Sequence, residues 1–510
     1  MKPFDENGAF RSIAPAGDGL RRLAVRGAGV TVLSNSLQFA IQMIATVVLA
    51  RLLTPADFGL VTMVSTFSLL FLNLGLNGFT EAILQREEIN HALVSNLFWI
   101  NTGMGLLLTI GFAGAAPLLA RFYGDPRVAS VTVASALTIL FTSVSVQHQA
   151  LLMRAMRFSD VAANGVVARG VSVTLSILLA LMGWGYWALV AGAVASPLAT
   201  SAGAWTLCRW VPGPPRRAVG TSSMVRFAMN TYGRFITSYF TRNMDNLLIG
   251  WRFGPESLGF YKKAYDLFIV PFGLSSPLTA VAVAALSRVT RDTNQYRRHF
   301  LSALSTLAFV GIGLGVALTL VGDDLIRLLL GPGWEESGRI FTVLGIGIGV
   351  TLLYGTQGWI HLSIGRADRS LRWGVVECTV TGSLFLLGLR WGPVGVAVAC
   401  VTSFSVLTIP ALWYAGRPAQ LDIASIIAAV WKYVLASALA GGASALIIWE
   451  IPSFAVASGP VGTIGQIVAA LGLFGALYLC AVTLLHRGYE PIRRVARLVR
   501  DMGPAQLEAR

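Results

Sequence analysis

Positively charged side chains interrupt long apolar stretches of this chain, where water is scarce. They are Arg169, Arg234, Arg242, Lys262 and Lys263. Arg169 and Arg234 have no carboxylate at helical spacing, and an ionised group at membrane depth marks a binding site or a water-filled pathway. Because guanidinium binds phosphate through paired hydrogen bonds, these cations suit a multivalent anion such as a diphosphate. Snorkelling to lipid headgroups is an equally good interpretation of Lys262 and Lys263.

Three carboxylates accompany these cations. Asp245 lies three residues after Arg242, and Asp266 lies four residues after Lys262. Either pair can meet on one helix face. Glu377 lies in a later apolar stretch. All three acids are candidates for proton or sodium coupling, and structural pairing explains each of them equally well.

Two apolar stretches each carry a continuous polar face. The first holds Thr31, Asn35, Gln38, Gln42 and Thr46, and the second holds Asn230, Arg234, Thr237, Ser238, Thr241 and Asp245. Each set falls within a narrow arc at helical periodicity. Hydrogen bonding between helices would explain a single glutamine. Two such faces at equivalent positions favour a polar cavity that both helices line.

The elements that carry these residues are predicted to be long membrane helices. The chain is 55% hydrophobic and only 12% charged, whereas a soluble domain is about one quarter charged. Stretches of about 20 apolar residues, enough for a span, occur about fourteen times. They are residues 30–50, 59–80, 92–116, 128–147, 160–182, 186–209, 227–251, 259–280, 299–321, 338–361, 373–389, 393–414, 425–449 and 461–485. We therefore predict an all-α polytopic membrane protein, because strand barrels have shorter, alternating segments.

Turn sequences recur at nearly constant spacing, which indicates an internal repeat. Leu53–Gly59 matches Phe253–Gly259 with Pro and Gly in the same places. Further along, Phe122–Pro126 matches Leu329–Pro332, and Gly183–Gly185 matches Arg390–Gly392. Three ordered matches predict two halves on one helical plan, as in transporters that rock one half against the other.

The repeat and the apolar stretches together predict the domain organisation. We expect a tail at 1–29, a first lobe at 30–210, a linker at 211–226, a second lobe at 227–414, two further helices at 415–485 and a basic tail at 486–510. In that tail, Val495, Leu498 and Met502 share one face of a possible helix. A membrane-surface anchor and a solvated tail both fit this pattern.

Charge predicts the orientation in the membrane. The net charge is +15, and most arginines fall in alternate connections and in the C-terminal tail. The positive-inside rule therefore places both termini in the cytoplasm. Because the charge is dispersed over short connections, we expect anionic headgroups as its partner and no nucleic acid. Residues 1–29 lack the apolar core of a cleavable signal peptide.

Metal, redox and nucleotide chemistry have no sequence support. The four cysteines, Cys208, Cys378, Cys400 and Cys480, lie in apolar stretches without paired spacing. The five histidines form no ligand motif, and no phosphate-binding glycine loop precedes a Lys-Ser or Lys-Thr pair. We therefore expect no cofactor, no metal and no ATP hydrolysis.

Five segments resemble one known family. They are Ala50–Gly59, Gly183–Val190, Arg242–Gly250, Tyr261–Leu267 with Pro271, and Gly365–Asp368. The resemblance covers residues 25–485 and is to the polysaccharide exporters of the multidrug/oligosaccharidyl-lipid/polysaccharide superfamily. It is strongest to the lipopolysaccharide and colanic-acid exporter branch, the Wzx-like flippases. In the eighth helix of that family, Arg often stands in place of one of the two lysines.

The resemblance implies two six-helix lobes in a V plus two C-terminal helices, in a bacterial inner membrane. It implies a monomeric flippase, not an enzyme, that moves undecaprenyl-diphosphate-linked oligosaccharide across that membrane. A polysaccharide polymerase and chain-length machinery are candidate partners. A drug/cation antiporter and a lipid II flippase share the fold, although an antiporter would place acids in the cavity. A membrane glycan polymerase would need a large outer loop, and the longest here is residues 322–337.

Overall fold

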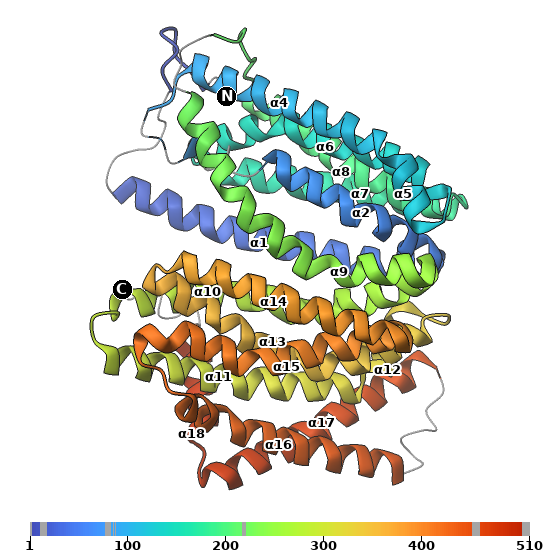
Figure 1. Cartoon of the computed structure of the whole chain (residues 1–510), viewed down its shortest axis with the longest axis vertical. Coiled ribbons are helices and arrows are strands. Elements are labelled where there is room, and N and C mark those ends of the chain that lie inside the picture. Colours follow the sequence, from blue (N-terminus) through green and yellow to red (C-terminus); the bar gives the residue numbers. More distant parts are fainter. Residues whose placement is uncertain are drawn as a thin grey trace. The chain divides into compact units, whose positions relative to one another are not determined.

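The computed structural model describes residues 3–10, 18–76, 83–84, 86, 88–216, 221–450 and 459–501. This described part is almost entirely α-helical (Figure 1), and its strand pairing is confined to two isolated bridges, Phe4 with Phe10 and Ala9 with Asn90. The all-α prediction is confirmed. The chain divides into two compact units, residues 1–259 and residues 260–510.

The first unit consists of long helices joined by tight turns. Its helices are α1 (Asp18–Leu52), α2 (Pro55–Leu76), α4 (His91–Gly114), α5 (Ala116–Tyr123), α6 (Arg127–Arg154), α7 (Phe158–Leu181), α8 (Tyr186–Cys208) and most of α9 (Thr221–Phe268). Helix α9 is broken at Gly254, which has a φ of 81° and is followed by Pro255. The predicted seventh and eighth helices therefore run into one another through this break.

The second unit continues the same pattern. Its helices are α10 (Val270–Arg288), α11 (Thr293–Leu320), α12 (Gly322–Leu330), α13 (Glu335–Ile364), α14 (Ala367–Gly388), α15 (Gly392–Gly416), α16 (Ile423–Glu450), α17 (Pro460–His486) and α18 (Glu490–Asp501). The connection expected at residues 322–337 contains the short helix α12 and the start of α13. The apolar stretch at 259–280 is divided, because Pro271 starts α10 within it.

Eleven stretches in the described part of the chain are long and apolar enough to cross a membrane. One of them, residues 368–419, contains both α14 and α15. Helices α9 and α10, which cover the seventh and eighth predicted spans, are not among the eleven. The chain is a multi-pass membrane protein, and the number of fourteen spans is not confirmed.

Short helices recur at matched positions of the repeat. Helix α5 ends at Gly124 with φ 69°, and α12 ends at Gly331 with φ 91°. These two glycines stand at equivalent places in the sequence repeat, and a positive φ at a helix end favours glycine. A short helix that ends at a glycine with positive φ is therefore repeated in the backbone at the places that the turn sequences predicted.

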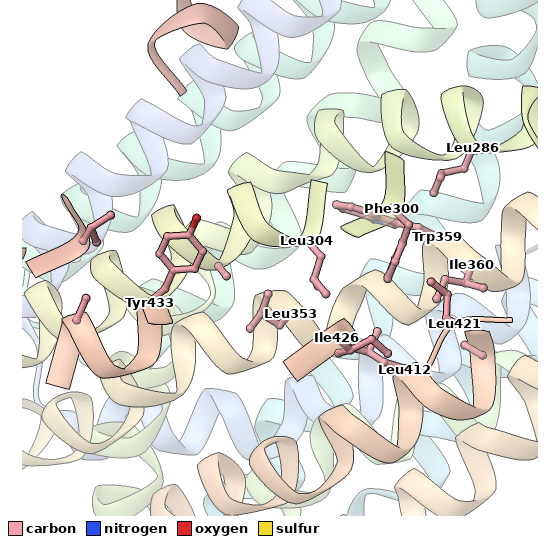
Figure 2. Close-up of a cluster of buried hydrophobic side chains, with 14 of the residues drawn as sticks. Leu286, Phe300, Leu304, Leu353, Trp359, Ile360, Leu412, Leu421, Ile426 and Tyr433 are labelled. Carbon is pink, nitrogen blue, oxygen red and sulfur yellow. The ribbon is translucent and has the colours of Figure 1, made fainter. Parts of the chain in front are cut away.

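The second unit has a large apolar core that joins its last two long helices to the others. Side chains from α10, α11, α13, α15 and α16 meet there (Figure 2), together with Phe474 and Tyr478 of α17. The Tyr478 hydroxyl also donates to the carbonyl oxygen of Phe309 at 2.7 Å. Helices α16 and α17 are therefore built into the second unit.

Candidate functional site

The structure brings together two of the predicted cavity residues. Helices α1 and α7 pack against each other, and Nη1 of Arg169 on α7 donates to Oε1 of Gln42 on α1 at 3.0 Å. Both side chains are half-buried. Two membrane-spanning helices thus converge on one guanidinium, whose remaining N–H groups can bind an anionic oxygen.

The neighbouring polar residues of α1 behave differently from Gln42. Gln38 donates from Nε2 to Oγ of Ser34 at 3.1 Å, and Ser34 donates to the carbonyl oxygen of Ala162 at 3.2 Å. The side chain of Gln38 also packs on Gly165 of α7, because a Cβ added to Gly165 would lie 3.1 Å from Nε2 of Gln38. Gln38 therefore stabilises the contact between α1 and α7, while Asn35 is exposed.

Only part of the predicted polar face of α9 can be described. The side chains of Asn230, Arg234, Thr237 and Ser238 lie outside the described residues. Beyond them, Arg242 is exposed and Thr241 is half-buried. Asp245 is 2% exposed, and its Oδ1 accepts a hydrogen bond from the backbone N–H of Asn246 at 2.8 Å. The predicted diphosphate contact of Arg234 and Arg242 stays a prediction.

In the second unit, the two adjacent lysines have different environments. Lys262 places Nζ 2.6 Å from Oδ1 of Asp266 and 5.9 Å from the ring centre of Tyr265. The predicted pair of Lys262 and Asp266 is thus confirmed. Lys263 is buried, at 7% exposure, which favours an interior role over snorkelling. Glu377 is half-buried on α14.

The two matched Pro–Gly turns pack against one another inside the first unit. A Cβ added to Gly59 would lie 1.6 Å from the carbonyl oxygen of Pro255, and one added to Gly259 would lie 1.9 Å from that of Pro55. The contact is reciprocal, since the glycine of each copy faces the proline of the other. Close approach of the two backbones explains why glycine occupies both positions.

Sequence reasoning missed a second set of polar contacts, which hold residues 209–216 against α4. Asn96 donates from Nδ2 to the carbonyl oxygen of Arg216 at 2.6 Å and accepts from its N–H at 2.8 Å. Ser95 accepts from the N–H of Gly213 at 3.0 Å, and Trp99 donates to its carbonyl oxygen at 2.8 Å. The spacing of Ser95, Asn96 and Trp99 on one helix face was the available signal.

Two histidines extend this set of contacts. His91 of α4 bonds the carbonyl oxygen of Val211 at 3.2 Å, and His148 of α6 bonds that of Trp210 at 3.1 Å. Segment 209–216 contains Pro212, Pro214 and Pro215, so its backbone is extended and poor in donors. The side chains of α4 and α6 therefore bind the backbone between Trp210 and Arg216, which includes the start of the predicted linker; residues 221–226 of that linker belong to α9.

Comparison with protein families identifies the chain. A family described as polysaccharide biosynthesis protein matches residues 48–339, which is more than half of the sequence. The chain belongs to this family. The resemblance expected from the five sequence segments is confirmed.

Individual members of known function are distant relatives. Teichuronic acid biosynthesis protein TuaB of Bacillus subtilis is 26% identical over 339 residues, which cover 65% of this chain and 67% of the relative. Lipopolysaccharide biosynthesis protein WzxC of Escherichia coli is 22% identical over 388 residues, covering 74% and 78%. Succinoglycan biosynthesis transport protein ExoT of Rhizobium meliloti is 21% identical over 361 residues, covering 71% and 73%.

Solved structures show the fold of this family member. Lipid II flippase MurJ in an inward closed conformation aligns with a TM-score of 0.71 at 14% identity, covering 91% of this chain and 99% of MurJ. An inward-facing multidrug resistance MATE transporter of the MOP superfamily aligns with a TM-score of 0.59 at 15% identity, covering 76% and 95%. The chain has the fold of this flippase and transporter superfamily.

Proposed function

We propose that this protein is a flippase that moves a polyprenyl-diphosphate-linked oligosaccharide across the bacterial inner membrane for surface polysaccharide synthesis. The observation that carries the proposal is the bond between Arg169 and Gln42, which places a cation between two membrane-spanning helices of a polysaccharide biosynthesis protein. A guanidinium in that position suits a diphosphate. The amide side chains of Asn35 and Gln42 on α1 suit sugar hydroxyls.

The names of the relatives support a glycan substrate. TuaB, WzxC and ExoT are named for teichuronic acid, lipopolysaccharide and succinoglycan, and ExoT is named as a transport protein. Their glycans differ, so they support the substrate class and select no particular sugar. We further propose that the polyprenyl chain stays in the bilayer while the polar headgroup passes through the protein.

We propose that both termini lie in the cytoplasm, because the arginine-rich connections fall on that side under the positive-inside rule. A monomer acting beside a polymerase and chain-length machinery fits the same proposal. Among the acids, Asp266 has a structural explanation in its bond to Lys262. Asp245 and Glu377 stay candidates for proton or sodium coupling alongside Asp266.

Replacement of Arg169 tests the function. In a strain whose only copy carries Arg169→Ala, surface polysaccharide should fall at least about tenfold, because a lost charge-assisted hydrogen bond costs about 1.5–3 kcal/mol. Lipid-linked oligosaccharide should accumulate in the inner membrane. Arg169→Lys should restore export only in part, since one ammonium cannot replace the guanidinium fork.

Arg327→Ala is the matched control, because Arg327 is 60% exposed on α12. All variants are compared at equal protein abundance. Normal export by Arg169→Ala would remove Arg169 from the site. Accumulation of lipid II in place of lipid-linked oligosaccharide would contradict the proposed substrate and support the lipid II alternative.

A further inference from the structure

Helix α18 starts immediately after a membrane span. Helix α17 ends at His486, and the chain turns through Arg487, with φ 50°, and Gly488, whose N–H donates to the carbonyl oxygen of Thr483 at 3.1 Å. Helix α18 then begins at Glu490. A connection of three residues is too short to carry a helix away from the end of its span, so α18 lies at the membrane surface.

Packing against other helices of the second unit holds α18 in this place. Pro491 is buried, and Ile492 and Val495 are half-buried. Arg494 donates from Nη1 to Oγ of Ser302 on α11 at 3.3 Å. The apolar side of α18 therefore faces the protein and the edge of the bilayer, and its register along α11 is set.

The other side of α18 is basic and exposed. Arg493, Arg497 and Arg500 follow one another at intervals of four and three residues, so they share one helix face, and all three are exposed. Segment 487–501 contains five arginines and two acids. One of these acids, Glu490, is paired with Arg497 at 3.1 Å.

Two further exposed groups lie near α18. Arg298 lies one turn before Ser302 on α11, close to the point where Arg494 binds, and it is exposed. Tyr489, between the two helices, is 65% exposed. Tyrosine at the end of a span prefers the headgroup level, where its ring and hydroxyl both find suitable surroundings.

We propose that α18 is a binding surface for the headgroups of anionic phospholipids. Arg493, Arg497 and Arg500 would hold lipid phosphates while the apolar side stays in the interface. Amphipathic helices with a basic polar face bind anionic bilayers in this way, and charge complementarity selects an anionic lipid over a zwitterionic one. The proposal rests on the multi-pass membrane character of the chain and does not depend on what it transports.

Lipid binding by the full-length protein tests the proposal. The purified protein is placed in nanodiscs of phosphatidylcholine, with or without phosphatidylglycerol, and its thermal unfolding midpoint is measured. Phosphatidylglycerol should raise the midpoint of the wild type, and added salt should weaken the effect. The triple variant R493Q/R497Q/R500Q should lose most of that rise. Native mass spectrometry should show fewer bound phosphatidylglycerol molecules.

Two further variants make the result decisive. R288Q/R291Q/R366Q removes the same charge from exposed residues elsewhere in the second unit, and it should keep the rise. R493K/R497K/R500K keeps the charge and should keep most of the rise, which separates lipid binding from a folding defect. An equal loss in both glutamine variants would overturn the proposal in favour of diffuse charge attraction. A wild type that is indifferent to phosphatidylglycerol would overturn it as well.

Discussion

Arg169, Gln38 and Gln42 show what a polar pattern predicts at the level of single residues. Their types and period mark them as unsuited to lipid, and the structure places all three at the contact of α1 and α7. Their roles differ, however, because Gln38 bonds to Ser34 on its own helix and Gln42 meets Arg169. The sequence could not separate the two glutamines, since the choice depends on which residues α7 brings opposite each turn of α1.

This difference gives a prediction for two otherwise equivalent substitutions. Gln42→Leu should lower export by about tenfold, because Arg169 loses the bond that orients its guanidinium. Gln38→Leu, one turn away on the same face, should leave export nearly normal and lower the thermal unfolding midpoint. Export and unfolding are measured for both variants at equal abundance. Equal export by the two would show that the bond between Arg169 and Gln42 does not position the cation.

At the level of elements, hydrophobic length predicted most of the long helices. The short helices α5 and α12 were missed, because eight or nine residues fall below the length that marks a span. The boundary between α9 and α10 was also missed, since Pro271 starts a new helix inside a continuous apolar stretch. Element length and hydropathy are local properties, whereas these boundaries depend on single proline and glycine residues.

The attachment of residues 209–216 to α4 could not be predicted from hydrophobic length. It depends on side chains that reach the backbone of a segment more than 110 residues away. Asn96, Trp99 and His91 look like ordinary polar residues near the end of a span. Only tertiary packing shows that their partner is a proline-rich chain that offers mostly carbonyl oxygens.

Asn96→Leu tests this attachment, because Asn96 makes two hydrogen bonds to the backbone of Arg216. Their loss should destabilise the protein by about 1–3 kcal/mol and release the segment. Trypsin cleavage after Arg209 and Arg216, followed by mass spectrometry, should become faster than in the wild type. Asn294→Leu, at an exposed position of α11, is the control. Unchanged cleavage in Asn96→Leu would show that the other contacts suffice to hold the segment.

At the level of the whole molecule, the sequence repeat and the compact units divide the chain at different places. The repeat predicts a linker at 211–226, whereas the boundary between the compact units falls between residues 259 and 260 of the sequence. The difference arises because the first part of α9 packs on the first unit. The hydroxyl of Tyr239 donates to the carbonyl oxygen of Thr66, and the rings of Trp251 and Phe122 stack with their centres 6.4 Å apart. A sequence repeat reflects the origin of the sequence, whereas a compact unit reflects which helices pack together.

The reciprocal contact of Gly59 with Pro255 and of Gly259 with Pro55 links the two copies of the repeat. If transport moves one copy against the other, as rocking transporters do, this contact must open in each cycle. Cysteines at Ala56 and Ser257, in a background without the four native cysteines, test that requirement. Oxidation should form a disulfide and stop export, and a reductant should restore it. The two single-cysteine variants under the same oxidant are the controls.

The crosslink also separates two explanations of the paired glycines. If they serve only to pack two turns closely, a disulfide should stabilise the protein and leave export unchanged. If the turns part during transport, export should stop while the protein stays folded, because the bond spans a contact that the cycle has to break. A confirmed crosslink with undiminished export would therefore exclude any cycle in which the two Pro–Gly turns separate.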